Sequence, residues 1–95
     1  MSQHDVGKPW FRLRGPAGAG NALEGARRAG GLTQAQLAVQ IGMDRTTVLA
    51  MEAGRSSVIA RFLKAFDWLG YDLIAVPKNA VVRVETHVPD LEGGE

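Results

Sequence analysis

The sequence predicts a mainly α-helical domain followed by a short β element, and three observations support this fold class. Apolar residues recur at helical spacing in four segments between residues 17 and 69. Glycine stands at or just beyond the end of each segment, where helices commonly stop. After Gly70 the pattern becomes β-branched and alternating, which is typical of strands.

The first predicted helix covers residues 17–29. Three glycines inside it, Gly18, Gly20 and Gly25, each cost about 1 kcal/mol relative to alanine. We therefore expect tertiary packing to hold this helix and Gly30-Gly31 to end it. Its apolar positions are Ala22, Leu23, Ala26 and Ala29.

A short second helix is predicted to follow Thr33. Thr33 and Gln36 have the spacing of a capping box, in which each side chain satisfies a backbone N–H at the helix start. Leu37 and Ile41 then form a narrow apolar stripe at i and i+4. Gly42 stands where a left-handed residue would end the helix.

A third helix of about two and a half turns is expected after Asp44, which suits the N-cap position. Val48 and Met51, three residues apart, should face inward, and Gly54 should close the helix. Two short helices joined by a tight turn, with a polar start to the second, suit the major groove of duplex DNA. The alternative is a helical hairpin in an unrelated α-helical domain.

This segment resembles the helix-turn-helix of the phage Cro and lambda-repressor family. The resemblance covers residues 21–70 and implies a four-to-five-helix lambda-repressor-like domain that binds DNA. The residues that carry it are Leu32-Thr33-Gln34, Leu37-Ala38, Ile41-Gly42, Val48 and Glu52-x-Gly54.

Helix position predicts which residues would contact DNA. The first turn of the second helix of the motif should point outward, so Arg45 and Thr46 should reach base edges, with Ala50 one turn later. Leu49 would contact either DNA or the preceding helix. The residues expected at phosphates are Gln34, Thr47, Arg55 and Ser56. The resemblance implies the same division for Arg45, Thr46, Ala50, Gln34 and Thr47.

The charge is distributed unevenly, although the formal net charge is only +1. Residues 8–64 contain nine basic and three acidic residues, whereas residues 67–95 contain two basic and six acidic ones. A basic first part favours phosphate binding there and a different role for the acidic end.

The last predicted helix covers Ser57–Leu69, with Ser56 or Ser57 as its cap and Gly70 after its end. Its apolar residues predict one broad face that supplies the core; they are Ile59, Phe62, Leu63, Phe66 and Leu69. Trp68 lies partly off that face, where it would cover the rim of the core or contact a second subunit.

A C-terminal β-strand or hairpin is predicted over residues 71–88, with a turn at residues 77–80. An isolated hairpin is barely stable in water, and its exposed edges can pair with another strand. We therefore expect two copies of the chain to form a homodimer through this element. The residues expected at that contact are Tyr71, Leu73, Ile74, Ala75 and Val76.

The chain ends are predicted to be an N-terminal arm and an acidic tail. The arm, residues 1–16, is either flexible or places Trp10-Phe11 on a partner subunit or its arginines along DNA. The tail, residues 89–95, is rich in glycine and acid and is expected to be disordered. The helix-turn-helix domain would then span residues 17–70.

The junction Leu69–Pro77 is similar to HipB-like antitoxins, the DNA-binding partners in toxin–antitoxin pairs. This second resemblance implies an autoregulatory repressor that also binds a toxin protein. A phage or mobile-element repressor without a toxin is one alternative. A protein-interaction module that lacks DNA binding is another.

Enzymatic, metal and membrane roles have little support in the sequence. There is no cysteine, and the two histidines, His4 and His87, lie far apart without a Ser or Asp arrangement. No catalytic residues, metal site or cofactor are expected. No apolar run approaches the length of a membrane span, so the protein is expected to be cytoplasmic.

Overall fold

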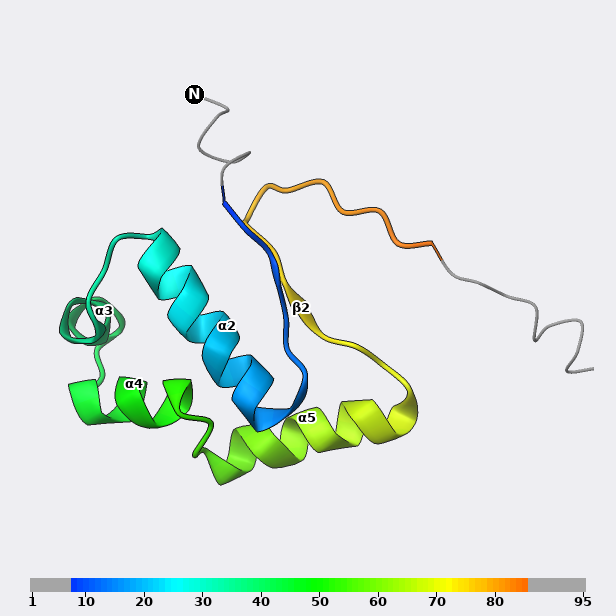
Figure 1. Ribbon diagram of the computed structural model, residues 1–95, viewed down its shortest axis with the longest axis horizontal. Helices are drawn as coiled ribbons and strands as arrows, with labels where there is room; N and C mark the ends of the chain where they lie inside the picture. Colours follow the sequence, from blue (N-terminus) through cyan, green and yellow to red (C-terminus); the bar gives the residue numbers. More distant parts are fainter. Residues whose placement is uncertain (1–7, 86–95) are drawn as a thin grey trace, which may run out of the picture.

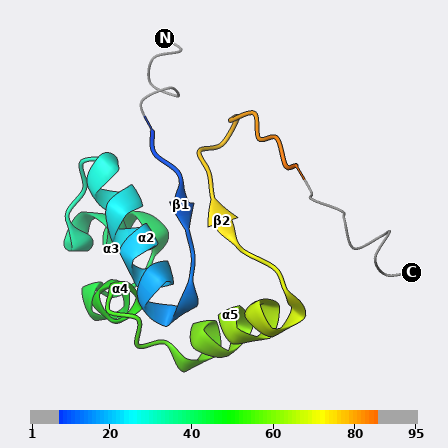
Figure 2. The same ribbon diagram turned by 45° about the vertical axis from the view of Figure 1, so that its right-hand side comes forward.

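The computed structural model describes residues 8–85, which form a mainly helical structure with a small two-stranded antiparallel sheet (Figure 1). The elements in chain order are β1 (Phe11–Arg12), α2 (Gly15–Ala29), α3 (Gln34–Ile41), α4 (Arg45–Glu52), α5 (Ser57–Leu69) and β2 (Ile74–Ala75). Helix α2 lies centrally and contacts β1, α4 and α5, while α3 contacts α4. The strands run beside α2, and α5 lies along one edge (Figures 1 and 2).

The helix ends follow the local signals in the sequence. The predicted capping box is present, because the Gln36 N–H donates to Thr33 Oγ1 at 3.1 Å and the Thr33 N–H donates to Gln36 Oε1 at 2.8 Å. Ser56 Oγ accepts from the Ile59 N–H at 3.3 Å and caps α5. Asp44 occupies the N-cap position of α4, but its side chain makes no capping hydrogen bond.

Gly20 has a packing role that helical propensity does not reveal. Helix α2 crosses the C-terminal end of α4 so closely that a Cβ at Gly20 would lie less than 3.0 Å from three backbone atoms of Met51 and Glu52. Gly25 is similarly covered by the Phe11 ring. These glycines weaken α2 as an isolated helix but allow its neighbours to approach.

The buried core is small, and α2, α3, α4 and α5 each contribute one apolar residue to it. Its apolar members within residues 8–85 are Ala22, Ala38, Val48 and Leu63. Val48 is completely buried, and two of the other three residues are alanines. A core of this size leaves little surplus of hydrophobic stabilisation for a domain of this length.

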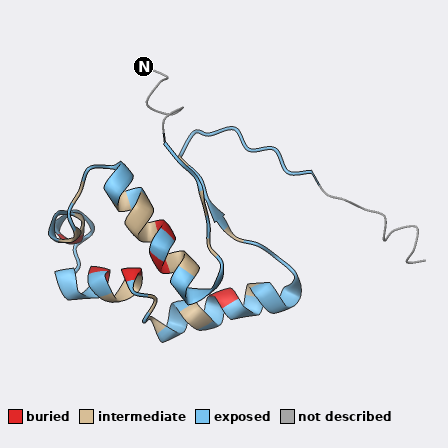
Figure 3. Cartoon of the chain, viewed as in Figure 1, coloured by how far each residue is buried: buried red, intermediate tan, exposed pale blue. Residues whose placement is uncertain are grey.

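The prediction that α5 uses one broad face for the core is wrong. Leu63 is buried, but Ile59, Phe62 and Leu69 are 37%, 56% and 60% exposed. Figure 3 shows that most of α5 is exposed. Helix α2 covers only part of the apolar circumference of α5, so the remainder faces outward. Trp68 is 84% exposed and does not cover the rim of the core.

Of the two alternatives predicted for residues 71–88, the strand is present as β2, and the hairpin is wrong for the residues that the structure describes. Ile74 and Ala75 pair with Arg12 and Phe11 in β1, and the Leu13 N–H donates to the Leu73 carbonyl at 2.9 Å. Residues 81–85 contain no strand, and 86–88 lie outside the described part of the chain, as does the predicted tail. Because the N-terminal strand takes one edge of β2, that edge cannot pair with residues 81–85.

Candidate nucleic-acid interface

Helices α3 and α4 form a compact pair joined by a left-handed turn. Gly42 has φ +70°, and the following Met43 N–H donates to the Ala38 carbonyl at 2.9 Å. This hydrogen-bonding pattern ends α3 abruptly and redirects the chain into α4. The turn therefore has the glycine-based geometry that the sequence predicts.

Two buried residues fix which face of α4 points outward. Val48 is 0% exposed and Glu52, one turn later, is 8% exposed. Arg45, Thr46 and Thr47 in the first turn are all exposed. The polar first turn of α4 is thus held on the surface by an anchored inner side.

The other two predicted base-contacting residues are less accessible. Leu49 is 37% exposed, and Ala50 is half-buried on the outer side of α4. A small alanine at this position leaves the neighbouring Thr46 uncovered, since the two lie one turn apart on the same side.

The residues predicted at phosphates lie on three elements. Gln34 opens α3 and is half-buried, Thr47 lies on α4, and exposed Arg55 lies in the loop before α5. Ser56 is half-buried, and its hydroxyl oxygen already accepts the capping hydrogen bond of α5. Gln34 and Thr47 thus lie on the α3–α4 pair itself, whereas Ser56 already has a structural role as the cap of α5.

A buried ion pair ties the motif together, and the sequence reasoning missed it. Arg27 Nε donates to Glu52 Oε2 at 2.6 Å, and Arg27 Nη2 donates to Glu52 Oε1 at 3.0 Å. Both side chains are less than a tenth exposed. Gln34 Nε2 also donates to Glu52 Oε1 at 3.1 Å, and Arg27 Nη1 donates to the Leu32 carbonyl at 2.8 Å. One carboxylate therefore links α2, α3 and α4.

This network lowers the pKa of Glu52 below its ordinary value of 4.5. The hydrogen bonds from Arg27 contribute most, burial opposes them, and the Gln34 amide adds to the lowering. The same pair raises the pKa of Arg27. Glu52 is thus held ionised, which the bidentate geometry favours.

A signal for the network is present in the sequence. Glu52 follows Val48 by four residues and therefore shares its inward face. A carboxylate on an inward face needs a buried cationic partner. The partner, Arg27, lies 25 residues earlier, so only the tertiary fold identifies it.

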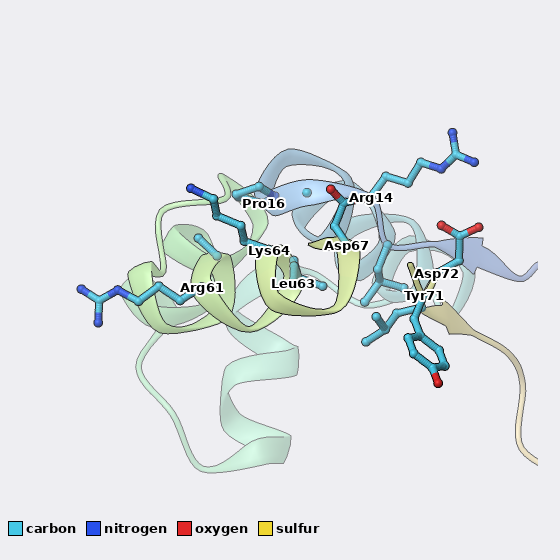
Figure 4. A pocket seen from close by; sticks show the side chains of 12 residues that line it. Arg14, Pro16, Arg61, Leu63, Lys64, Asp67, Tyr71 and Asp72 are labelled. Atoms are coloured by element: carbon cyan, nitrogen blue, oxygen red, sulfur yellow. The ribbon is translucent and has the colours of Figure 1, made fainter. Parts of the chain in front are cut away.

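The residues predicted at a dimer contact are mostly exposed. Tyr71 is 64%, Ile74 43% and Val76 39% exposed, and Ala75 is also exposed. Leu73 is half-buried and lines a surface cavity of about 580 Å³ between α5 and the start of α2 (Figure 4). No residue of α3 or α4 lines this cavity. The cavity is therefore separate from the α3–α4 surface, and the tips of Arg14 and Arg61 point to opposite sides of it (Figure 4).

A family described as a helix-turn-helix domain matches residues 19–69, which include all of α3, α4 and α5 and most of α2. No curated protein and no solved structure matches the chain. Within residues 8–85, no helix has the length and apolar character needed to cross a membrane.

Proposed function

Because this chain belongs to the helix-turn-helix domain family, a family of DNA-binding regulators that is typically non-enzymatic, we propose that it is a sequence-specific transcriptional repressor. The observation that carries this proposal is the exposed first turn of α4. Arg45 and Thr46 stand on the surface there, while Val48 and Glu52, further along α4, are buried and anchor the helix. This arrangement suits insertion into a major groove.

Each residue predicted to contact DNA has a proposed role. Arg45 would bind guanine O6 and N7 through two parallel hydrogen bonds, and Thr46 would contact a polar base edge or a thymine methyl. Ala50 and Leu49 would add apolar contacts. Gln34, Thr47, Arg55 and Ser56 would hold the phosphate backbone. Gln34 is already oriented by Glu52 at 3.1 Å, which leaves its second amide hydrogen and its carbonyl oxygen for DNA.

The repressor is proposed to act as a homodimer that reads two half-sites about 34 Å apart. The exposed side chains of Tyr71, Ile74, Ala75 and Val76, with Leu73 behind them, would contribute to the contact between copies. One edge of β2 is occupied by β1, so the second edge is the one available for pairing with another chain.

A second partner is proposed from the Leu69–Pro77 junction, which is similar to HipB-like antitoxins. In that role the chain would repress its own operon and bind a toxin protein. The competing proposals are a phage or mobile-element repressor without a toxin and a protein-interaction module. A toxin gene beside this one would favour the antitoxin role over the phage repressor.

The experiment that tests DNA binding is an anisotropy titration with the DNA upstream of the chain's own gene, repeated over a series of salt concentrations. About six phosphate contacts per dimer predict a slope of log K against log salt of roughly −5. Shuffled DNA of the same composition is the control. A slope near zero on the upstream DNA would reject the proposed repressor function and favour the protein-interaction module.

A further inference from the structure

Helix α5 carries a second apolar stripe, separate from its core contact. Val58, Phe62, Ala65 and Leu69 follow one another at intervals of four, three and four residues. At 3.6 residues per turn they lie within roughly 60° of the helix circumference. Val58 is 72%, Phe62 56% and Leu69 60% exposed, and Ala65 is also exposed. These four residues are called the α5 seam below.

An apolar stripe with alternating four- and three-residue spacing is what one helix presents to another in coiled-coil-like packing. In this chain the four seam residues are exposed, and α5 lies along one edge of the molecule (Figure 1). We propose that the occupant of the seam is the α5 seam of a second copy, with the two helices antiparallel. The inference rests on the proposed homodimer and identifies its main contact.

The seam is complementary to itself in the antiparallel orientation. A two-fold axis between residues 63 and 64 places Val58 of one copy opposite Leu69 of the other. The same axis places Phe62 opposite Ala65, so each large ring meets a small side chain. A parallel arrangement would place Phe62 against Phe62 and leave a gap between the two alanines. The order of side-chain sizes therefore favours a two-fold antiparallel pair.

The flanks of the seam also suit a protein partner. Phe62 and Phe66 pack edge to face with ring centroids 5.1 Å apart, and Phe66 and Tyr71 continue this ladder at 6.1 Å. On the opposite flank, Arg61 of one copy would lie almost level with Trp68 of the other, a cation–π arrangement. No charged residue lies in the seam itself.

The exposed aromatic area agrees with a dimer contact. Phe62, Trp68 and Tyr71 are each more than half exposed. Together they offer on the order of 400 Å² of side-chain surface, about half of what each partner buries in a standard interface. The seam aliphatics and the residues of the C-terminal segment supply more.

Sedimentation equilibrium of the full chain tests the location of the contact. Phe62→Glu should raise the dimer dissociation constant about 30-fold or more, because it places a charge at the centre of the contact. Val39→Glu is the matched control, since Val39 is 76% exposed on α3. It should leave the dimer unchanged, and circular dichroism should show both variants folded.

A size swap tests the register. Ala65→Phe alone should weaken the dimer, because two rings would then meet across the axis. Combining it with Phe62→Ala exchanges large and small positions and should restore the dimer. A non-specific apolar contact would instead become tighter with Ala65→Phe, and that result would overturn the register.

Disulfide cross-linking tests the relative orientation of the two α5 helices. Because the natural chain contains no cysteine, only the introduced cysteines can react. A mixture of Val58→Cys and Leu69→Cys proteins should form a mixed disulfide. Val58→Cys alone should not cross-link, because its two copies would lie roughly 16 Å apart along the helices. Efficient self-cross-linking of Val58→Cys would show a parallel pair and contradict the proposal.

The outcomes for this contact and for the proposed function are separable. If the Phe62→Glu protein remains as dimeric as the natural chain, the proposed seam contact is rejected, but the proposed repressor function is unaffected. A natural chain that is monomeric alone, and associates only with a different protein, also overturns the seam contact. If the natural chain binds no DNA while the Val58→Cys and Leu69→Cys proteins still form the mixed disulfide, the repressor proposal is rejected and the seam is supported.

Discussion

At the scale of single residues, Arg45 is expected to determine which base pairs the protein prefers. Arg45→Ala should cost about 1–3 kcal/mol per half-site on the specific operator, because a bidentate contact to guanine is lost. The loss on random DNA should be much smaller. Competition anisotropy with the operator and with random duplex measures both values in one experiment.

Gln34→Ala is the comparison, since Gln34 is assigned to the phosphate backbone. It should weaken operator and random DNA by similar factors. Gln34 also donates to Glu52, so thermal unfolding must be measured to separate lost contact from lost stability. If Arg45→Ala and Gln34→Ala show the same operator-to-random ratio, the division between base and phosphate contacts is wrong.

Glu52 gives the fold a defined dependence on pH. Its pKa is lower in the folded chain than the ordinary 4.5, chiefly through Arg27. Between the two pKa values the unfolded chain binds more protons, so stability rises with pH there. The contribution of Glu52 is complete above about pH 5 and is lost as pH falls through the folded value.

Urea denaturation from pH 3 to pH 7 measures this effect. Glu52→Gln should lower stability at pH 7 and flatten the stability curve at the acidic end, because the titrating carboxyl is absent. An equally steep acidic loss in the natural chain and in Glu52→Gln would assign the acid sensitivity to other carboxylates.

The Glu52 network also shows where residue-level prediction stops. Thr33 and Gln36 lie three residues apart and satisfy each other locally, so their capping box is readable from sequence. Arg27 and Glu52 lie on different helices, and nothing local relates them. A pair of this kind emerges only when α2 has packed on α4.

At the scale of elements, the packing of α2 on α4 depends on Gly20. Gly20→Ala should gain about 1 kcal/mol of helical propensity. It should nevertheless destabilise the fold by about 1–3 kcal/mol, because the added methyl meets the backbone of α4. Chemical denaturation measures the difference.

Gly18 provides the matched control on the same helix. A Cβ at Gly18 would lie 3.5 Å from its nearest neighbour, Arg14 Cβ, which is ordinary contact. Gly18→Ala should therefore stabilise the fold by about 0.4–1 kcal/mol. Equal effects of the two substitutions would mean that α2 and α4 pack less closely than described.

The helices were more predictable than the strands for a physical reason. Capping residues and left-handed glycines act over a few residues, so the bounds of α5 and the turn at Gly42 follow from local sequence. Ile74 and Ala75 were recognisable as strand, but their partner Phe11–Arg12 lies at the other end of the chain. Alternation alone favoured the nearer residues 81–88, which was wrong for 81–85.

The outward face of α5 was misjudged for a related reason. Periodicity identified Phe62, Leu63 and Leu69 as one apolar surface, but it cannot say which neighbour covers each part. Of these three residues, only Leu63 is buried within one copy of the chain. The division into a core side and a seam depends on where α2 crosses, which is a tertiary property.

At the scale of the whole molecule, the proposed interface and the α5 seam are expected to cooperate through geometry. Each α4 would engage one half-site, and the seam would hold the two copies as one rigid body. The second half-site is then bound at high effective concentration, which strengthens binding without any new contact to DNA.

Phe62→Glu should separate these two effects, because Phe62 lies on α5 and outside the proposed DNA contacts. Binding to an isolated half-site should be nearly unchanged. Binding to the full operator should weaken about 100-fold or more. The salt slope on the full operator should also fall from roughly −5 towards −3, since each monomer contributes about three phosphate contacts. Anisotropy titrations of the natural chain and of Phe62→Glu on both DNAs measure all of these values. A full-operator affinity and slope that stay unchanged would show that the half-sites are coupled by another surface, and the exposed C-terminal residues around Ile74 would be the next to test.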